Sequence, residues 1–200
     1  MEKLFIKGKK KISGSISISG SKNATLPILA ASLLANDIKL TNVPFVKDIS
    51  TMLELLRFIG TTVKIMRNKK SIELKNNKNI KTLAPYNLVK TMRAGVLVLG
   101  PLLTKFKKAK VSLPGGCAIG TRPVDLHLFA LKKLGAKIKI KDGYIIADAV
   151  KGLKGTKIKF PSVSVGATEN ALLAAYGANG KTVLSNCAIE PEIIDLISFL

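Results

Sequence analysis

The sequence predicts an α/β protein built from three similar units, with helices packed inward against β-sheets. Some segments alternate apolar and polar residues, as residues 136–140 do, and this period is typical of strands. Other segments place apolar residues three and four positions apart, as residues 52–59 do, which is typical of helices that bury one face. The same order of helical and strand segments recurs along the chain, which predicts a repeated fold.

The first unit begins with an apolar helix that we expect over residues 24–34. Strands are expected over 38–44 and 61–65, with a second helix between them. Asp48 lies at the expected start of this second helix, where free amides favour a negative side chain. Gly60 lies at its expected end, because glycine readily adopts the left-handed backbone that closes many helices.

The second unit repeats this order. We expect an apolar helix over residues 88–99 and a strand over 109–114. A further helix is expected to begin at Asp125 and to end before Gly135, and a strand over 136–140 follows it. The acid and the glycine have the same positions in this unit as in the first.

The third unit is expected to contain a helix over residues 168–178, a strand over 181–186 and a helix that begins at Glu192. By analogy with Gly60, this unit is expected to continue past Leu200 to a glycine and a closing strand. We therefore expect the sequence to be part of a longer chain, with its third unit incomplete.

Composition favours a folded protein without a membrane segment. The hydrophobic fraction is 47%, and no apolar run reaches the roughly 18 to 20 residues that a membrane span needs. The basic N-terminus is not followed by the apolar core of a secretory signal. Two cysteines do not make a disulfide framework, so we expect a cytoplasmic protein.

The net charge of +21 has two interpretations. Clustered cations bind the phosphates of nucleic acids, which makes a nucleic-acid-associated protein one hypothesis. However, nearly all of the cations are lysines, the aromatic fraction is 5% and tryptophan is absent, so residues for base stacking are scarce. We expect a solvated basic surface without a nucleic-acid or membrane partner, and keep nucleic-acid binding as the alternative.

A glycine-rich loop within residues 113–127 carries the strongest chemical signal. It places Cys117 among three glycines, with a proline on each side. Glycine lets the backbone approach a ligand closely, and Arg122 is a planar cation that can grip phosphate or carboxylate. A thiol beside such a cation loses its proton more easily and can act as an acid, a base or a nucleophile. The alternative is a surface turn that contains a cysteine.

Two further segments point to anions. Residues 20–24 are expected to join a strand over 15–19 to a helix, and the free amides of a helix start, with Lys22 beside them, attract anions. The alternative is a plain capping turn. Arg93 stands in an otherwise apolar predicted helix, where it is either a ligand for anions or a surface cation whose stem packs on apolar neighbours.

The other chemically active residue types are expected to be structural. His127 is expected to be a hydrogen-bond partner, because no set of metal ligands stands near it in the sequence. Cys187 follows a predicted strand and is expected to be a small buried apolar residue. A phosphate-binding P-loop, a dinucleotide fingerprint and a Ser-His-Asp set are all absent from the sequence, so we expect no metal and no cofactor.

Three of these motifs carry a family resemblance. Residues 20–24, 88–94 and 113–127 resemble, in order and spacing, the UDP-N-acetylglucosamine enolpyruvyl transferases. The resemblance implies an inside-out α/β barrel of repeated folding units, an architecture shared with EPSP synthase. It also implies transfer of the enolpyruvyl group of phosphoenolpyruvate to the 3-hydroxyl of UDP-N-acetylglucosamine, with release of phosphate. This reaction is the first committed step of peptidoglycan synthesis.

The resemblance also implies roles for individual residues. Cys117 is expected to donate a proton to the substrate and to be the target of fosfomycin, and Lys22, Asn23 and Arg122 are expected to bind phosphoenolpyruvate. The residues expected to bind UDP-N-acetylglucosamine are Asn23, Arg93, Arg122, Pro123, Val124, Asp125, Leu126, Val163, Ser164, Val165 and Gly166. Ser162 stands where the family usually has a lysine, so the cation of one diphosphate contact is absent from the sequence.

The family protein is longer, and the sequence corresponds to its N-terminal half. Residues 1–20 are therefore expected to be a leading strand region that belongs to a second, otherwise missing domain. Residues 21–200 are expected to be the first domain, which carries the cysteine loop. The resemblance places a general-base aspartate and further arginines in the missing half, so a separately encoded C-terminal half is a candidate partner. The alternative is an inactive remnant that at most binds the UDP-sugar.

Overall fold

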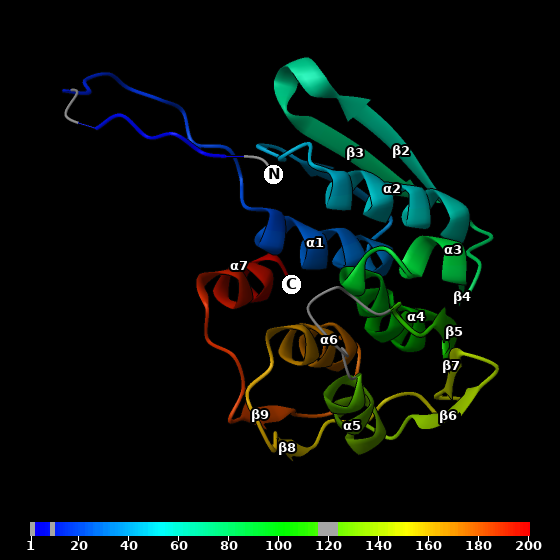
Figure 1. Ribbon diagram of the computed structural model, residues 1–200. Helices are drawn as coiled ribbons and strands as arrows, with labels where there is room; N and C mark the ends of the chain where they lie inside the picture. The colour runs from blue at the N-terminus through cyan, green and yellow to red at the C-terminus, as the bar shows by residue number, and fades with distance from the viewer. Residues whose placement is uncertain (1–2, 9–10, 116–123) are drawn as a thin grey trace.

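Helices lie at the centre of the structure, and three small β-sheets, counted over the described residues, lie around them (Figure 1). The computed structural model describes residues 3–8, 11–115 and 124–200. Leu29, Leu99 and Ala171 come from central helices of different units and are fully buried in one apolar core. The core therefore lies among the helices and between the helices and the sheets, which is the inside-out arrangement that the sequence predicts.

The first unit confirms the predicted order of its first four elements and adds a strand. Its elements are α1 (Lys22–Ala31), the short 3₁₀ helix η1 (Ser32–Leu34), β1 (Asp37–Leu40), α2 (Lys47–Ile59), β2 (Thr61–Met66), the 3₁₀ helix η2 (Arg67–Lys69) and β3 (Ser71–Asn76). Strand β3 lies between β1 and β2 and is antiparallel to both, so Leu74 stands opposite Ile38 and Val63. Helix α2 carries Asp48 in its first turn and ends at Gly60, whose φ is 122°.

The second and third units repeat this arrangement. The second consists of β4 (Leu83–Ala84), α3 (Tyr86–Val89), the 3₁₀ helix η3 (Arg93–Val98), α4 (Leu99–Phe106), β5 (Lys108–Ser112), α5 (Asp125–Lys133), β6 (Lys137–Lys141) and β7 (Tyr144–Asp148). The third consists of β8 (Lys157–Lys159), α6 (Val165–Ala175), β9 (Val183–Ser185) and α7 (Pro191–Phe199). Strand β7 lies between β5 and β6 as β3 lies between β1 and β2. Strands β8 and β9 pair in parallel, as β4 and β5 do, so the repeat is confirmed.

The prediction of one helix over residues 88–99 is wrong. The chain forms α3, then η3, and only then the α-helix α4, which contains Pro101 in its first turn, where a missing amide hydrogen costs little. Between α3 and η3, Met92 has an extended backbone and buries its side chain at 4% exposure. Arg93 therefore begins η3 instead of standing within a continuous apolar helix.

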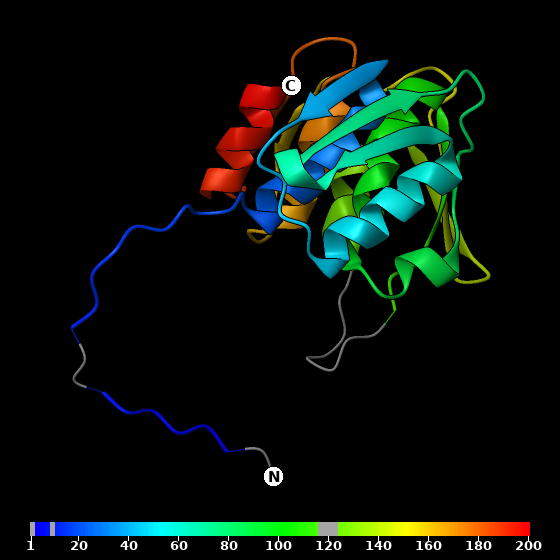
Figure 2. The same cartoon turned by 90° about the horizontal axis from the view of Figure 1, so that it is seen from above.

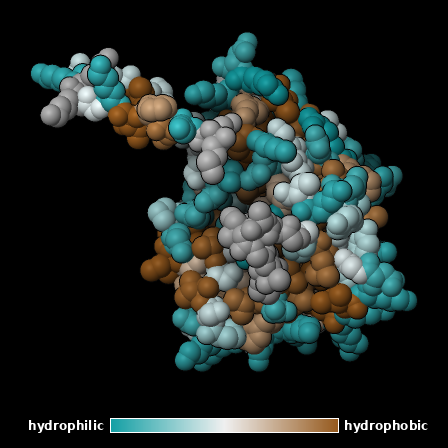
Figure 3. Space-filling model, viewed as in Figure 1, coloured by the Kyte–Doolittle hydropathy of each residue, from teal (hydrophilic) through white to brown (hydrophobic). Residues whose placement is uncertain are grey.

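Residues 15–19 form no strand in this structure, and their assignment to a strand of a second, otherwise missing domain stays a prediction. These residues belong to none of the three sheets, and Ile16 and Ile18 are 85% and 77% exposed. The described residues before α1 stand away from the body (Figures 2 and 3). Alternating residues form a strand only where another strand offers its hydrogen-bonding edge, and no described strand lies beside this segment. In the part of the chain that the structure describes, no helix is long and apolar enough to cross a membrane.

Candidate functional site

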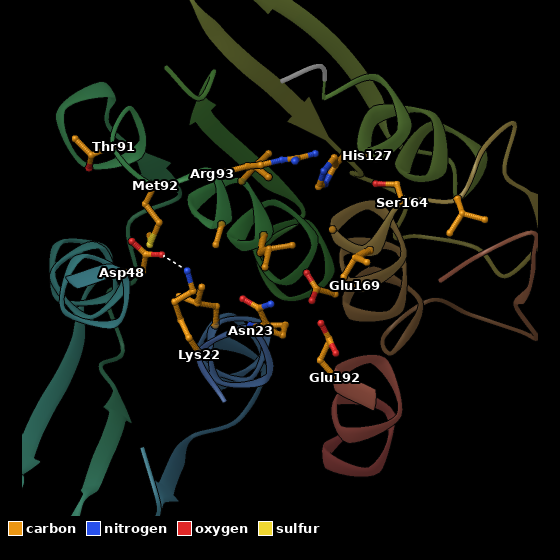
Figure 4. Close-up of a pocket in the computed structure, with 18 residues that line it drawn as sticks. Lys22, Asn23, Asp48, Thr91, Met92, Arg93, His127, Ser164, Glu169 and Glu192 are labelled. Carbon is orange, nitrogen blue, oxygen red and sulfur yellow. Dashed lines mark hydrogen bonds and ion pairs between the residues drawn. The ribbon is translucent and has the colours of Figure 1, made fainter. Parts of the chain in front are cut away.

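A pocket of about 700 Å³ lies where the first turns of five helices meet (Figure 4). The residues that these first turns contribute include Lys22 of α1, Asp48 of α2, His127 of α5, Val165 of α6 and Glu192 of α7. The first amides of a helix have no partner within the helix, and the helix dipole places partial positive charge there. Five helix starts around one pocket therefore favour an anionic ligand.

The start of α1 is fixed by its capping residues. The Oγ of Ser21 accepts a hydrogen bond from the Ala24 amide at 3.3 Å, and the Thr25 hydroxyl donates to the Ser21 carbonyl at 2.7 Å. A Cβ at Gly20 would collide with the backbone carbonyl of Asn42, so this close approach requires glycine. The capping turn that the sequence offered as the alternative is thus present, and it also places Lys22 at the pocket.

The ammonium of Lys22 pairs with the carboxylate of Asp48, which also lines the pocket. Lys22 Nζ donates to Asp48 Oδ2 at 2.9 Å, and the two side chains are 46% and 38% exposed (Figure 4). Such an exposed pair contributes about 0 to 1 kcal/mol to stability. The ammonium can therefore exchange this partner for an anionic ligand at little cost. The sequence predicts Asp48 at a helix start, but its position at the pocket becomes visible only in the structure.

The second described cation of the pocket is Arg93. The buried side chain of Met92 anchors the backbone just before it, and the Arg93 side chain is exposed and extends towards His127 (Figure 4). A guanidinium presents a planar set of donors that suits phosphate and carboxylate oxygens. Together with Lys22, it gives the pocket two cations that come from different units of the repeat.

The start of α6 forms another wall of the pocket. Ser164 caps this helix, because its Oγ accepts from the Ala167 amide at 3.4 Å. The Thr168 hydroxyl donates to the Ser164 carbonyl at 2.8 Å and accepts from the Ala188 amide at 3.0 Å, which ties this turn to the loop before α7. A Cβ on Gly166 would lie 3.2 Å from Cε1 of His127, so a small residue lets α6 pack close to α5.

The structure brings together many of the predicted site residues. Those that line the pocket are Lys22, Asn23, Arg93, Val163, Ser164, Val165 and Gly166. Cys117, Arg122 and Pro123 lie outside the described residues. Three others lie outside the pocket lining: Val124 is buried in the core, Leu126 packs against the core, and Asp125 is exposed. In residues 3–8, 11–115 and 124–200, no three His, Cys, Asp or Glu side chains lie close enough to hold a metal ion.

Glu169 also lines the pocket, although it was not among the predicted site residues. It is 6% exposed, and burial, followed by the nearby carboxylate of Glu192, raises its pKa from 4.5 to about 7, against an opposing effect of Arg93. The signal was present in the sequence, because Glu169 and Asn170 interrupt an otherwise apolar helix. At neutral pH this carboxyl group is therefore divided between its protonated and its ionised form.

We expect Glu169→Gln to stabilise the protein at pH 8. A pKa raised in the folded state means that folding favours the protonated acid, so the stability of the parent falls as pH rises from 4.5 through about 7. This pKa shift lowers the free energy of unfolding of the parent by about 3 kcal/mol at pH 8 and by less than about 1 kcal/mol at pH 5. Urea unfolding of parent and variant at both pH values measures this difference.

His127 changes stability with pH in the opposite direction, because burial and then Arg93 lower its pKa from 6.5 to about 4. The stability that His127 contributes is lost as pH falls from 6.5 towards 4. Because parent and Glu169→Gln both contain His127, its contribution cancels when the two are compared at the same pH. Glu54→Gln, on the exposed face of α2, is the matched control and should stay within about 0.5 kcal/mol of the parent. A Glu169→Gln variant that is less stable than the parent at pH 8 would contradict the prediction.

Comparison with known proteins identifies the family. The model of the family described as EPSP synthase (3-phosphoshikimate 1-carboxyvinyltransferase) matches residues 6–200, so the chain belongs to this family. The chain is 65% identical over 201 residues to UDP-N-acetylglucosamine 1-carboxyvinyltransferase of Pelagibacter ubique, covering 100% of this chain and 48% of that protein. The protein of the same name from Rickettsia prowazekii is 58% identical, with 98% of this chain and 47% of that protein covered.

Solved structures agree with the fold. The enolpyruvyl transferase NikO from Streptomyces tendae has a TM-score of 0.81 at 20% identity, covering 96% of this chain and 45% of that one. EPSP synthase from Acinetobacter baumannii has a TM-score of 0.72 at 17% identity, covering 90% of this chain and 42% of that one. The inside-out α/β architecture is thereby confirmed. The chain spans about half the length of the curated relatives that it matches.

Proposed function

We propose that this chain forms part of the active site of an enzyme that transfers the enolpyruvyl group of phosphoenolpyruvate to UDP-N-acetylglucosamine. The observation that carries the proposal is the pocket at which five helix starts meet Lys22 and Arg93. Both substrates are multiply charged anions, and such a pocket suits their phosphate and carboxylate oxygens. The names of the 65% and 58% identical relatives support this choice among anionic ligands.

The proposed chemistry proceeds by addition and elimination. The 3-hydroxyl of the sugar loses its proton to a base, its oxygen bonds to C2 of phosphoenolpyruvate, and C3 takes a proton from the thiol of Cys117. Loss of a proton from C3 and of phosphate from C2 then restores the double bond. Lys22 and Arg122 stabilise the charge on the phosphate as it departs. The base is proposed to come from residues beyond those present in this sequence.

The sugar nucleotide is proposed to lie along the pocket wall that the start of α6 forms. Val163 to Gly166 present the start of α6, and Arg93 faces the same part of the pocket. Val124, Asp125 and Leu126 are outside the pocket lining as described, so their contacts with the ligand stay predictions. The enzyme is proposed to act in peptidoglycan synthesis in the cytoplasm, with a C-terminal half as partner and no nucleic-acid or membrane partner.

Calorimetric titration of the 200-residue chain with UDP-N-acetylglucosamine tests the proposal. We expect saturable binding of one nucleotide per chain, weakened about tenfold or more by Arg93→Ala, because a hydrogen bond to a charged group contributes about 1.5 to 3 kcal/mol. Arg57→Ala, on the exposed face of α2 and outside the pocket lining, is the matched control and should bind as the parent does.

Two results would count against the proposal. Weakening of equal size in Arg93→Ala and Arg57→Ala would show general attraction by the basic surface. Binding that any polyanion displaces, and that falls steeply with salt, would favour the nucleic-acid alternative.

A further inference from the structure

Asn170 is a fully buried polar residue in the middle of α6. Its Oδ1 accepts a hydrogen bond from the Gly100 amide at 2.8 Å, and its Nδ2 donates to the Val96 carbonyl at 3.1 Å. Backbone amides only donate and backbone carbonyls only accept, so these two partners fix which end of the side-chain amide is oxygen and which is nitrogen. The orientation of Asn170 is therefore set by η3 and by the first turn of α4.

The second hydrogen of this nitrogen is directed at His127. Asn170 Nδ2 lies 3.1 Å from Nδ1 of His127, and the His127 side chain is 2% exposed. Because the amide nitrogen can only donate, Nδ1 must accept and cannot carry a proton. The ring is then neutral and carries its single hydrogen on Nε2.

The charges around the ring agree with a neutral histidine. Burial lowers the pKa of His127, and the positive charge of Arg93 in η3 lowers it further, to about 4. Glu169, one residue before Asn170, and Glu192 of α7 are the described carboxylates of α6 and α7 that line the same pocket. They do not outweigh burial and Arg93 in the pKa of His127.

The Nε2 edge of the ring lies at the pocket wall. A Cβ on Gly166 would stand 3.2 Å from Cε1 and 3.4 Å from Nε2, so this edge lies beside the start of α6. The ring lines the pocket between the Arg93 guanidinium and Ser164 (Figure 4). A neutral N–H donor thus lies among charged groups in the part of the pocket where the sugar nucleotide is proposed to bind.

We propose that Asn170 holds His127 as the Nε2–H tautomer, so that the ring donates one hydrogen bond to an acceptor oxygen of the bound sugar nucleotide. His127 is then a binding residue, and Asn170 is a positioning residue that acts through it. The ligand contact rests on the proposed function, whereas the tautomer rests on the hydrogen bonds of Asn170 alone.

Nitrogen NMR of the ring tests the tautomer directly, because His127 is the single histidine of the chain. In the 200-residue protein labelled with ¹⁵N-histidine, we expect an unprotonated Nδ1 and a protonated Nε2 at pH 7. Nδ1 is expected to gain a proton only near pH 4. Asn170→Asp replaces the donor by an acceptor and is expected to move the proton to Nδ1 and to raise the pKa. An Nδ1–H ring or an imidazolium in the parent at pH 7 overturns the inference without any variant.

Titration with UDP-N-acetylglucosamine tests the ligand contact. His127→Gln keeps an N–H donor and should bind within about threefold of the parent, whereas His127→Leu should bind about tenfold more weakly, since one net hydrogen bond is lost. Equal affinities for His127→Leu and the parent overturn the contact. If the parent binds no nucleotide, the proposed function and the contact both fail. An Nδ1–H ring in a chain that binds the nucleotide overturns this inference alone.

Discussion

A chimera that joins this chain to the remaining half of its Pelagibacter relative is expected to release phosphate at about 1 per second or more when given both substrates. The 200-residue chain by itself is expected to release none above background. The reason is physical: the described pocket has cations and helix starts on its walls, but Lys22 and Arg93 are exposed to water. Charge stabilisation at a transition state is strong only where water is excluded.

Phosphate release from purified, monomeric protein supplied with phosphoenolpyruvate and UDP-N-acetylglucosamine measures this difference. The remaining half of the relative, expressed without this chain, is the control and should also be inactive. Turnover by the 200-residue chain alone would show that its own residues suffice for catalysis. An inactive chimera that folds as its parents do would contradict the proposed function.

Local rules explain the elements that the sequence predicted correctly. Asp48, Asp125 and Glu192 each stand in the first turn of a helix, because an acid there pairs with free amides a few residues away. Gly60 and Gly135, with φ of 122° and 97°, end two of these helices in a conformation that suits glycine. Each of these signals depends on neighbours within one turn, so a single sequence contains it.

Strand pairing is not local, and for this reason the sequence analysis missed two strands. Residues 71–76 alternate as a strand should, yet the two-strand interpretation of each unit left out β3 and its counterpart β7. Residues 15–19 alternate as well, and no described strand pairs with them. Periodicity shows that a segment suits a sheet, whereas its pairing depends on chain elements far away in the sequence.

The candidate site divides in the same way. Only the family resemblance predicted that Lys22 and the start of α6 belong to one site. Local sequence patterns do not show which distant turns lie close together in the fold. Glu169 and Asn170 were missed, since their roles depend on partners such as Glu192 and His127 that other elements supply. His127 was correctly expected to be a hydrogen-bond partner. Cys187 was expected to be buried, and it is partly buried against the core.

In the chimera, Lys22→Ala is expected to lower kcat/KM for phosphoenolpyruvate about 100- to 1000-fold, because one preorganised cation that stabilises a departing anion contributes on that scale. Its free energy of unfolding should change by less than about 1 kcal/mol, since the Lys22–Asp48 pair is half exposed. Phosphate release at varied phosphoenolpyruvate, together with urea unfolding, separates the two effects.

Lys47→Ala is the matched control for Lys22→Ala, because Lys47 is an exposed lysine at the start of α2 and lies outside the pocket lining. It should leave kcat/KM unchanged. Asp48→Asn removes the partner of Lys22 but keeps the cation, so it should retain most of the activity that Lys22→Ala loses. If Lys22→Ala and Asp48→Asn lose activity equally, the pair matters for the shape of the pocket. If Lys22→Ala loses none, the ammonium does not contact the departing phosphate.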